Sequence, residues 1–260
     1  RIGKEIHALE YAALLNCKRS NDFSPCGDCR SCINIKMYQH EEVHFIYPVK
    51  LLKDGKSENF IMDTKTTENL ISQYELKRKN PYHKINFETS TTISINSIRN
   101  IKKKLFLSKS DENWSIIIIN EAEKLCIPNV EAANSLLKIL EEPPDRTLFI
   151  LITSKLNQII PTIQSRCQKI HFPDMSLSEL TKYVNANKLK EFIGEPLQLC
   201  NGSLHNISEN LDNEISYFMD VFNLFYSTKL DQVSNLILNF ESNIKTDKKY
   251  VKRQLNYLII

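Results

Sequence analysis

The run of four isoleucines at residues 116–119 constrains the fold more than any other feature of the sequence. A second apolar run covers residues 148–152, and the segment between the two runs has helical spacing. Continuous β-branched runs on either side of a helix are typical of parallel strands that are buried on both faces and joined by a right-handed crossover. The sequence therefore predicts an α/β fold, with a parallel sheet flanked by helices.

Polar residues follow both runs. Asn120 and Glu121 come directly after the isoleucines, and Thr153 follows the second run. Ligands of open parallel sheets bind beyond the carboxyl ends of the strands. We therefore predict that these side chains share a site at that edge of the sheet.

Further elements are predicted from local patterns. Helices are expected to begin at Gly3-Lys4, over residues 93–107, briefly at 161–165, and after the capping-box pair Ser176 and Glu179; strands are expected at 43–47 and 169–172. The central helix should be capped by Asn129, bury Val130, Ala133, Leu137 and Leu140, and end at Pro143-Pro144. Residues 49–92 are polar, with a turn expected at Asp54-Gly55, which predicts an insertion or a mobile segment rather than core.

The overall composition narrows the class of protein. The 42% hydrophobic content is enough for a sizeable core, and the net charge of +3 is too small to indicate nucleic-acid binding by itself. No apolar run has the length of a bilayer span and no signal segment opens the chain, so we expect a cytoplasmic protein without membrane contact. The lysines at 102–104 fit a solvated helix face better than a DNA-binding patch.

Four of the seven cysteines lie within sixteen residues. Cys17, Cys26, Cys29 and Cys32 have the spacing C-x8-C-x2-C-x2-C, and Gly27 allows a tight turn between the second and third. This spacing predicts a closed, structural Zn²⁺ site with four thiolate ligands. The alternative is a set of free thiols that are close in sequence by chance.

Lys4 stands at a helix start, where a phosphate-binding loop would place its lysine. The next residue should then be Ser or Thr to bind Mg²⁺, but it is Glu5, and the isoleucine strand ends in Asn120 where Asp would hold the metal. Glu121 keeps the position of a water-activating carboxylate. ATP and Mg²⁺ binding on this chain is therefore doubtful, and a surface lysine is the alternative for Lys4.

Arg166 lies in a Ser-Arg-Cys string beyond the second strand. It could be a surface arginine that pairs with Asp or Glu. The alternative is an arginine finger that reaches the γ-phosphate bound by a neighbouring subunit, because the site on its own chain is impaired.

Three strings, NEAE at 120–123, AANSLLKILEEPP at 132–144 and PTIQSRC at 161–167, resemble the clamp-loader AAA+ proteins of bacterial DNA polymerase III, and among these the delta-prime family of subunits. The resemblance implies a RecA-like AAA+ domain at 1–173, incomplete at its amino end, with a zinc module at 17–32 and the polar insertion at 49–92. It implies a helical lid at 174–208 and a C-terminal all-α collar domain at 209–260, which we expect to be incomplete. It also makes Arg166 the arginine finger and Thr153 the first sensor position.

The ATP-hydrolysing tau/gamma subunits of the same family share these strings. They require Ser or Thr, Asp and Arg at the positions that are Glu5, Asn120 and His205 here. These departures favour a delta-prime-type stator, largely inactive as an ATPase, in a hetero-pentamer with tau/gamma and delta subunits that loads the sliding clamp onto primer-template DNA. A zinc-stabilised DNA-binding protein is a third, weaker hypothesis.

Overall fold

The computed structural model describes residues 3–186 except 22, 50, 54–59, 88–91 and 108–111. Residues 3–173 form one compact unit, and the second unit begins at Asp174. The turn predicted at Asp54-Gly55, the collar, most of the lid, and His205 lie outside the described residues. Within the described part, no helix is long and apolar enough to cross a membrane.

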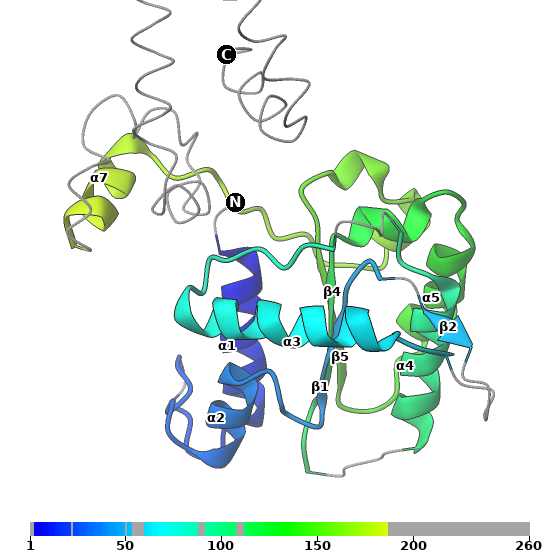
Figure 1. The fold of residues 1–260 in the computed structure, drawn as a ribbon, viewed down its shortest axis with the longest axis horizontal. Coiled ribbons are helices and arrows are strands. Elements are labelled where there is room, and N and C mark those ends of the chain that lie inside the picture. Colours follow the sequence, from blue (N-terminus) through cyan, green and yellow to red (C-terminus); the bar gives the residue numbers. More distant parts are fainter. Residues whose placement is uncertain are drawn as a thin grey trace, which may run out of the picture. The chain divides into compact units, whose positions relative to one another are not determined.

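A three-stranded parallel sheet forms the centre of the first unit, in the order β1-β4-β5 (Figure 1). Its strands are β1 (Val43–Ile46), β4 (Ser115–Asn120) and β5 (Thr147–Ile152). Helices α1 (Lys4–Asn16) and α2 (Arg30–Lys36) lie on one side, and α4 (Ile95–Leu107) and α5 (Glu131–Glu141) on the other. The predicted parallel sheet with flanking helices is confirmed.

The four isoleucines of β4 are completely buried because they alternate between two separate cores. Ile116 and Ile118 pack with α1 and α2, while Ile117 and Ile119 pack with α4 and α5. Successive side chains of a strand point to opposite faces, so an unbroken apolar run requires cover on both sides.

Polar contacts fix the point where β4 begins. The Asn16 side chain, at the end of α1, accepts from the Trp114 backbone N–H at 2.9 Å and donates to the Trp114 carbonyl at 3.1 Å. The Ser115 hydroxyl donates to the Glu42 carboxylate at 2.5 Å, and the Ile116 N–H donates to the Glu42 carbonyl at 2.8 Å. Asn16 and Glu42 are both buried.

The remaining elements are short, apart from α3. They are the antiparallel pair β2 (Leu52–Lys53) and β3 (Phe60–Ile61), helix α3 (Thr64–Lys79), the 3-10 turns η1 (Ala122–Cys126) and η2 (Leu156–Gln158), α6 (Pro161–Gln164), and α7 (Leu177–Ala186) in the second unit. The capping box predicted for α7 is confirmed, because Ser176 and Glu179 exchange side-chain and backbone hydrogen bonds.

Two local predictions were wrong, and a third was right only in part. Residues 49–92 do contribute to a core, since Val49, Ile85 and Phe87 are buried with Tyr47. Residues 169–172 form no strand, and Ile170 is 74% exposed because no neighbouring strand among the described residues pairs with this segment. The apolar stripe of α5 was right for Ala133, which is buried, and for Leu137 and Leu140, which pack half-buried against the core, although Ala132, Leu136 and Ile139 are the more deeply buried side chains. The N-cap is Val130, which is 41% exposed, and not the predicted Asn129, whose Oδ1 accepts from the Glu131 N–H instead.

Candidate functional site

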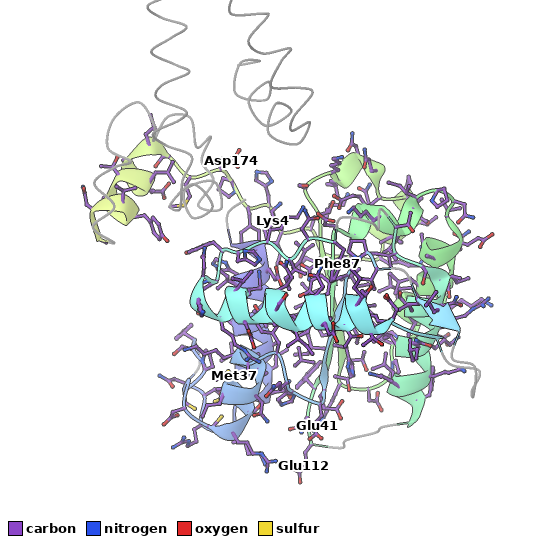
Figure 2. All side chains as sticks on the ribbon, in the orientation of Figure 1. Lys4, Met37, Glu41, Phe87, Glu112 and Asp174 are labelled. Carbon is purple, nitrogen blue, oxygen red and sulfur yellow. The ribbon has the colours of Figure 1, made fainter. Side chains whose placement is uncertain are left out.

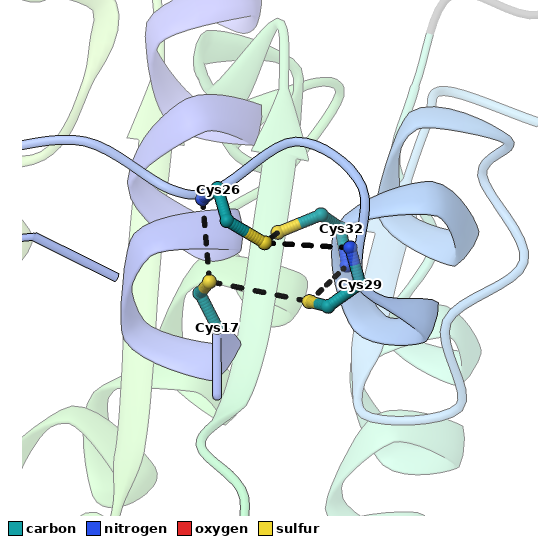
Figure 3. Close-up of side chains that lie close together, drawn as sticks. All are labelled: Cys17, Cys26, Cys29 and Cys32. Carbon is teal, nitrogen blue, oxygen red and sulfur yellow. Dashed lines mark hydrogen bonds between the residues drawn. The ribbon is translucent and has the colours of Figure 1, made fainter. Parts of the chain in front are cut away.

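The four clustered cysteines converge between the end of α1 and the start of α2 (Figure 3). Cys17 is the residue after α1, Cys29 is the N-cap of α2, and Cys32 lies in the first turn of α2. All four sulfur atoms lie within 4.8 Å of one another. The prediction that these thiols meet is therefore confirmed.

The sulfur spacing fits a tetrahedral metal ion. Cys17 Sγ and Cys29 Sγ are 3.9 Å apart, and Cys26 Sγ and Cys32 Sγ are 4.0 Å apart. Four thiolates at the usual Zn–S distance of about 2.3 Å would be about 3.8 Å from one another. The cluster can hold Zn²⁺ with little rearrangement.

Backbone amides already point at these sulfur atoms. The N–H groups of Cys26 and Cys29 donate to Cys17 Sγ and Cys26 Sγ, each at 3.3 Å, and the N–H of Cys32 donates to Cys29 Sγ at 3.5 Å. The Cys32 N–H bond lowers the pKa of Cys29 to about 6, whereas burial raises the pKa of Cys32 to about 12. Hydrogen bonds to the charged form favour it, so the loop favours the thiolate at Cys29, whereas burial favours the neutral thiol at Cys32.

Gly27 makes the turn between Cys26 and Cys29 possible. Its φ is +78°, in the left-handed region, and an added Cβ would meet no atom within 4 Å. Glycine is therefore required by the backbone conformation and not by crowding.

The predicted nucleotide-site residues lie at the other end of α1. Lys4 begins the helix after Gly3, which has φ +76°, so the predicted helix start is confirmed. Figure 2 shows Lys4 at one end of the first unit and Glu41 and Glu112, which precede β1 and β4, at the opposite end of that unit. Lys4 Nζ donates to the carbonyl of Thr153, just beyond β5, at 2.8 Å.

Glu5, the residue after this lysine, is paired within the chain. Its carboxylate lies 2.8 Å from Lys77 Nζ of α3 and accepts from the Tyr47 hydroxyl at 3.2 Å. Lys77 Nζ also donates to the His83 carbonyl at 2.7 Å, and its side chain is only 3% exposed. An internal ammonium group therefore neutralises the carboxylate where a magnesium site would need a hydroxyl.

Replacing Lys77 with methionine should lower the free energy of unfolding by about 2 kcal/mol, because it leaves the Glu5 carboxylate poorly solvated and without its cation. Urea unfolding monitored by circular dichroism would measure this. Lys79→Met, on the exposed surface of the same helix, is the matched control and should change stability little. Equal stability of the Lys77 and Lys79 variants would show that the Glu5–Lys77 pair contributes nothing.

Asn120 and Glu121 lie together at the end of β4, as predicted. Asn120 is buried, and its Nδ2 has no hydrogen-bond partner within the described structure. Glu121 has φ +51° and ψ +51°, a strained left-handed conformation for a residue with a Cβ. Its carboxylate pairs with Lys84 and Lys124, both at 2.6 Å.

These pairs decide the charge state of Glu121. Burial raises the pKa of its carboxyl, but the hydrogen bonds and charges of Lys124 and Lys84 outweigh burial and lower that pKa below its usual value. Glu121 is thus a charged carboxylate at neutral pH, and its two ammonium partners belong to its own chain.

Thr153 has a partner that the sequence did not indicate. Its hydroxyl donates to the Glu123 carboxylate at 2.6 Å and accepts from the Lys155 N–H at 3.0 Å. Glu123 is buried in the 3-10 turn after β4. Lys4, Thr153 and Glu123 therefore form a continuous polar chain across the carboxyl ends of β4 and β5.

Arg166 belongs to a separate group. Its Nη2 lies 2.5 Å from Glu141 Oε1, and its Nη1 donates to the Thr162 carbonyl at 2.9 Å and to the Ser165 hydroxyl at 3.5 Å. It forms a surface ion pair, the first of the two alternatives for this residue, and the position of that pair on α5 was not predicted.

The structure thus brings together the four cysteines, and Lys4 with Thr153. In the described part of the chain, no hydrogen bond or ion pair joins Asn120 or Glu121 to Thr153. Sequence reasoning missed Lys77, Lys84, Glu123 and Glu141. Glu123 lies one turn after Asn120 in an acidic string, which is a usable signal. The partners Lys77 and Lys84 come from the 49–92 segment, and no local spacing connects that segment to the strand ends.

Comparison with known proteins relates this chain to bacterial replication proteins. Residues 1–176 match the family described as "DNA polymerase III, delta subunit". DNA polymerase III subunit tau of Bacillus subtilis is 27% identical over 210 residues, which are 81% of this chain and 29% of that protein. DNA polymerase III subunit delta' of two Buchnera aphidicola subspecies, Schizaphis graminum and Baizongia pistaciae, is 30% and 32% identical over 66% and 65% of this chain.

The chain spans less than half the length of these three relatives, at 29%, 47% and 46%. A solved gamma subunit-related protein from Thermotoga maritima aligns with 62% of this chain and 61% of its own at 20% identity, with a TM-score of 0.33. A TM-score of 0.33 supports no argument about the fold.

Proposed function

Because the chain belongs to the DNA polymerase III delta subunit family, we propose that it is a delta-prime-type clamp-loader subunit of DNA replication that does not hydrolyse ATP itself. The observation that carries the second half of this proposal is the Glu5–Lys77 ion pair at 2.8 Å. A phosphate-binding helix needs a hydroxyl at this position to hold Mg²⁺. Glu5 has no hydroxyl, and its carboxylate, already bound by the internal Lys77, offers the metal no free ligand.

The rest of the degenerate site supports the same proposal. Lys4 Nζ is bonded to the Thr153 carbonyl, Glu121 is held by two lysines, and Asn120 offers an uncharged amide in place of a metal-binding carboxylate. These residues do not fit Mg²⁺-ATP as an active motor would bind it. The proposed role of this chain therefore includes no hydrolysis of its own.

In the proposed role, the subunit acts on a neighbour. Arg166 inserts its guanidinium beside the γ-phosphate that an adjacent tau/gamma subunit binds and stabilises the charge that develops in phosphoryl transfer. The partners are the tau/gamma and delta subunits in a hetero-pentamer, and through them the sliding clamp and primer-template DNA. The proposed architecture is a RecA-like AAA+ domain to Pro173, followed by the helical lid and the collar.

Zn²⁺ is the proposed structural cofactor, held by Cys17, Cys26, Cys29 and Cys32. When bound, it cross-links the end of α1 to the start of α2 and leaves no open coordination position for chemistry. The sulfur distances and the backbone N–H groups directed at Cys17, Cys26 and Cys29 support this assignment.

An ATP-hydrolysing tau/gamma-type subunit is the second candidate, because the tau protein aligns with 81% of this chain. The two candidates differ in where hydrolysis occurs. The full-length protein alone, incubated with ATP, Mg²⁺ and primed DNA, should show no turnover, and adding it to tau/gamma and delta subunits should raise DNA-stimulated hydrolysis. Sustained hydrolysis by the isolated protein would favour the tau/gamma assignment.

A further inference from the structure

Arg166 is held entirely by groups of its own chain in this structure. Nη2 is directed at Glu141, and Nη1 is directed at the carbonyl of Thr162 and the hydroxyl of Ser165. Recognition of a phosphate group by arginine uses the same terminal N–H groups, often two at a time. While Nη2 remains on Glu141, fewer of the guanidinium N–H donors are left for a two-pronged contact with phosphate.

The position of Glu141 in its helix is unfavourable for a negatively charged side chain. Glu141 is the last residue of α5, and the negative end of the helix dipole disfavours a carboxylate there. Pro143 and Pro144 follow and prevent the helix from continuing. Glu141 is thus fixed at an electrostatically poor place, and Arg166 supplies the compensating charge from the end of α6.

The pair is suited to being broken. The two side chains remain 34% and 48% exposed, for Arg166 and Glu141 respectively. Ion pairs with this much solvent contact shift an equilibrium by about fivefold at most. A γ-phosphate carries more charge than a carboxylate and can displace it from the guanidinium.

We propose that Glu141 is a positioning residue that retains Arg166 on its own subunit and competes with the neighbour's γ-phosphate for the guanidinium. This inference rests on the proposed function of Arg166. It goes beyond that function because it assigns a restraint to Glu141: part of the cost of inserting the finger is the loss of the Glu141–Arg166 pair. Removing the carboxylate should therefore release the arginine and speed up hydrolysis by the neighbour.

The test compares Glu141→Gln with wild type in a loader reconstituted from full-length subunits. We expect the turnover number for ATP without DNA to rise about two- to fivefold, and this rise to disappear when Arg166→Ala is also present. Glu142→Gln removes an equal charge from the adjacent residue, which forms no ion pair in the described part of the chain, and should leave turnover unchanged.

A spectroscopic readout tests the pair without any partner subunit. In the isolated full-length protein, rotation of the Arg166 guanidinium, followed by NMR, should be slow in wild type and faster in Glu141→Gln. Unchanged rotation, or a Glu141→Gln effect that survives in the Arg166→Ala background, would overturn the inference.

The failures of the two proposals are distinguishable. If Arg166→Ala abolishes stimulated hydrolysis while Glu141→Gln leaves the turnover number unchanged or lowers it, Glu141 does not restrain Arg166. The proposed role of Arg166 as an arginine finger is then still supported. If Arg166→Ala itself has no effect on the neighbour's hydrolysis, the proposed function fails and the restraint falls with it.

Discussion

Arg166→Ala is expected to lower the DNA-stimulated ATPase of the reconstituted clamp loader at the neighbouring site by roughly 10³-fold, the usual effect of removing an arginine finger. The substitution removes the only charge proposed to reach the neighbour's γ-phosphate. It leaves the fold intact because Arg166 contacts Glu141, Thr162 and Ser165 at a partly exposed position. Hydrolysis should be measured per site, since other subunits in the ring continue to turn over.

Two measurements accompany this experiment. Arg166→Lys keeps the positive charge but lacks the planar fork of arginine, so it should recover only a small part of the rate. Arg146→Ala, which removes an exposed arginine at the turn before β5, should leave the ATPase close to wild type. Wild-type turnover at every site with Arg166→Ala in an assembled ring would contradict the assignment of the finger.

Loss of the metal site should have the largest effect on stability. Cys32→Ser removes a proposed zinc ligand, whose side chain is also buried against α1 and β4. Structural zinc sites couple metal binding to folding with apparent free energies of about 10 kcal/mol or more in small domains. Here part of the module is also held by Ile35 in the core, so we expect a loss of about 3 kcal/mol or more, with hydrogen exchange rising over residues 17–36.

Zinc content is the direct check. Protein purified without chelators should carry close to one zinc per chain, and Cys32→Ser should carry far less. Cys126→Ser is the matched control, because Cys126 is half-buried against the other core and lies outside the cluster. A metal-free wild-type protein that is as stable as the zinc-loaded one would remove zinc from the proposal.

Features that depend on residues close together in the sequence were predictable. The isoleucine run indicated a strand covered on both faces, and the cysteine spacing brought four thiols into one cluster, because the geometry of a strand and of two short turns is local. The helix start at Lys4 and the capping box at Ser176 are local in the same sense. Each prediction depended on residues only a few positions apart.

The errors and omissions have a different origin. The stripe of α5 was predicted only in part because the helix begins at Glu131 with Val130 as its N-cap, so Val130 is exposed, and Ala132, Leu136 and Ile139 join Ala133 in the core. Lys77 and Glu141 were missed because each completes a charge pair with a residue that is near only after the chain has folded. Sequence spacing could identify Glu5 as unusual for a phosphate site but could not identify the ammonium group that stabilises it.

The buried isoleucine strand has one more consequence. Because the four side chains are identical, a shift of β4 by one residue along its neighbours would still place isoleucine at three of the four buried positions. The apolar run therefore does not specify its alignment by itself. Glu42 adds the missing information, because its carboxylate accepts a hydrogen bond from the Ser115 hydroxyl, which isoleucine lacks, while Asn16 binds the backbone of Trp114 beside it. These buried polar contacts at the start of β4 therefore help to determine that Asn120 and Glu121 are the residues at the other end of the strand.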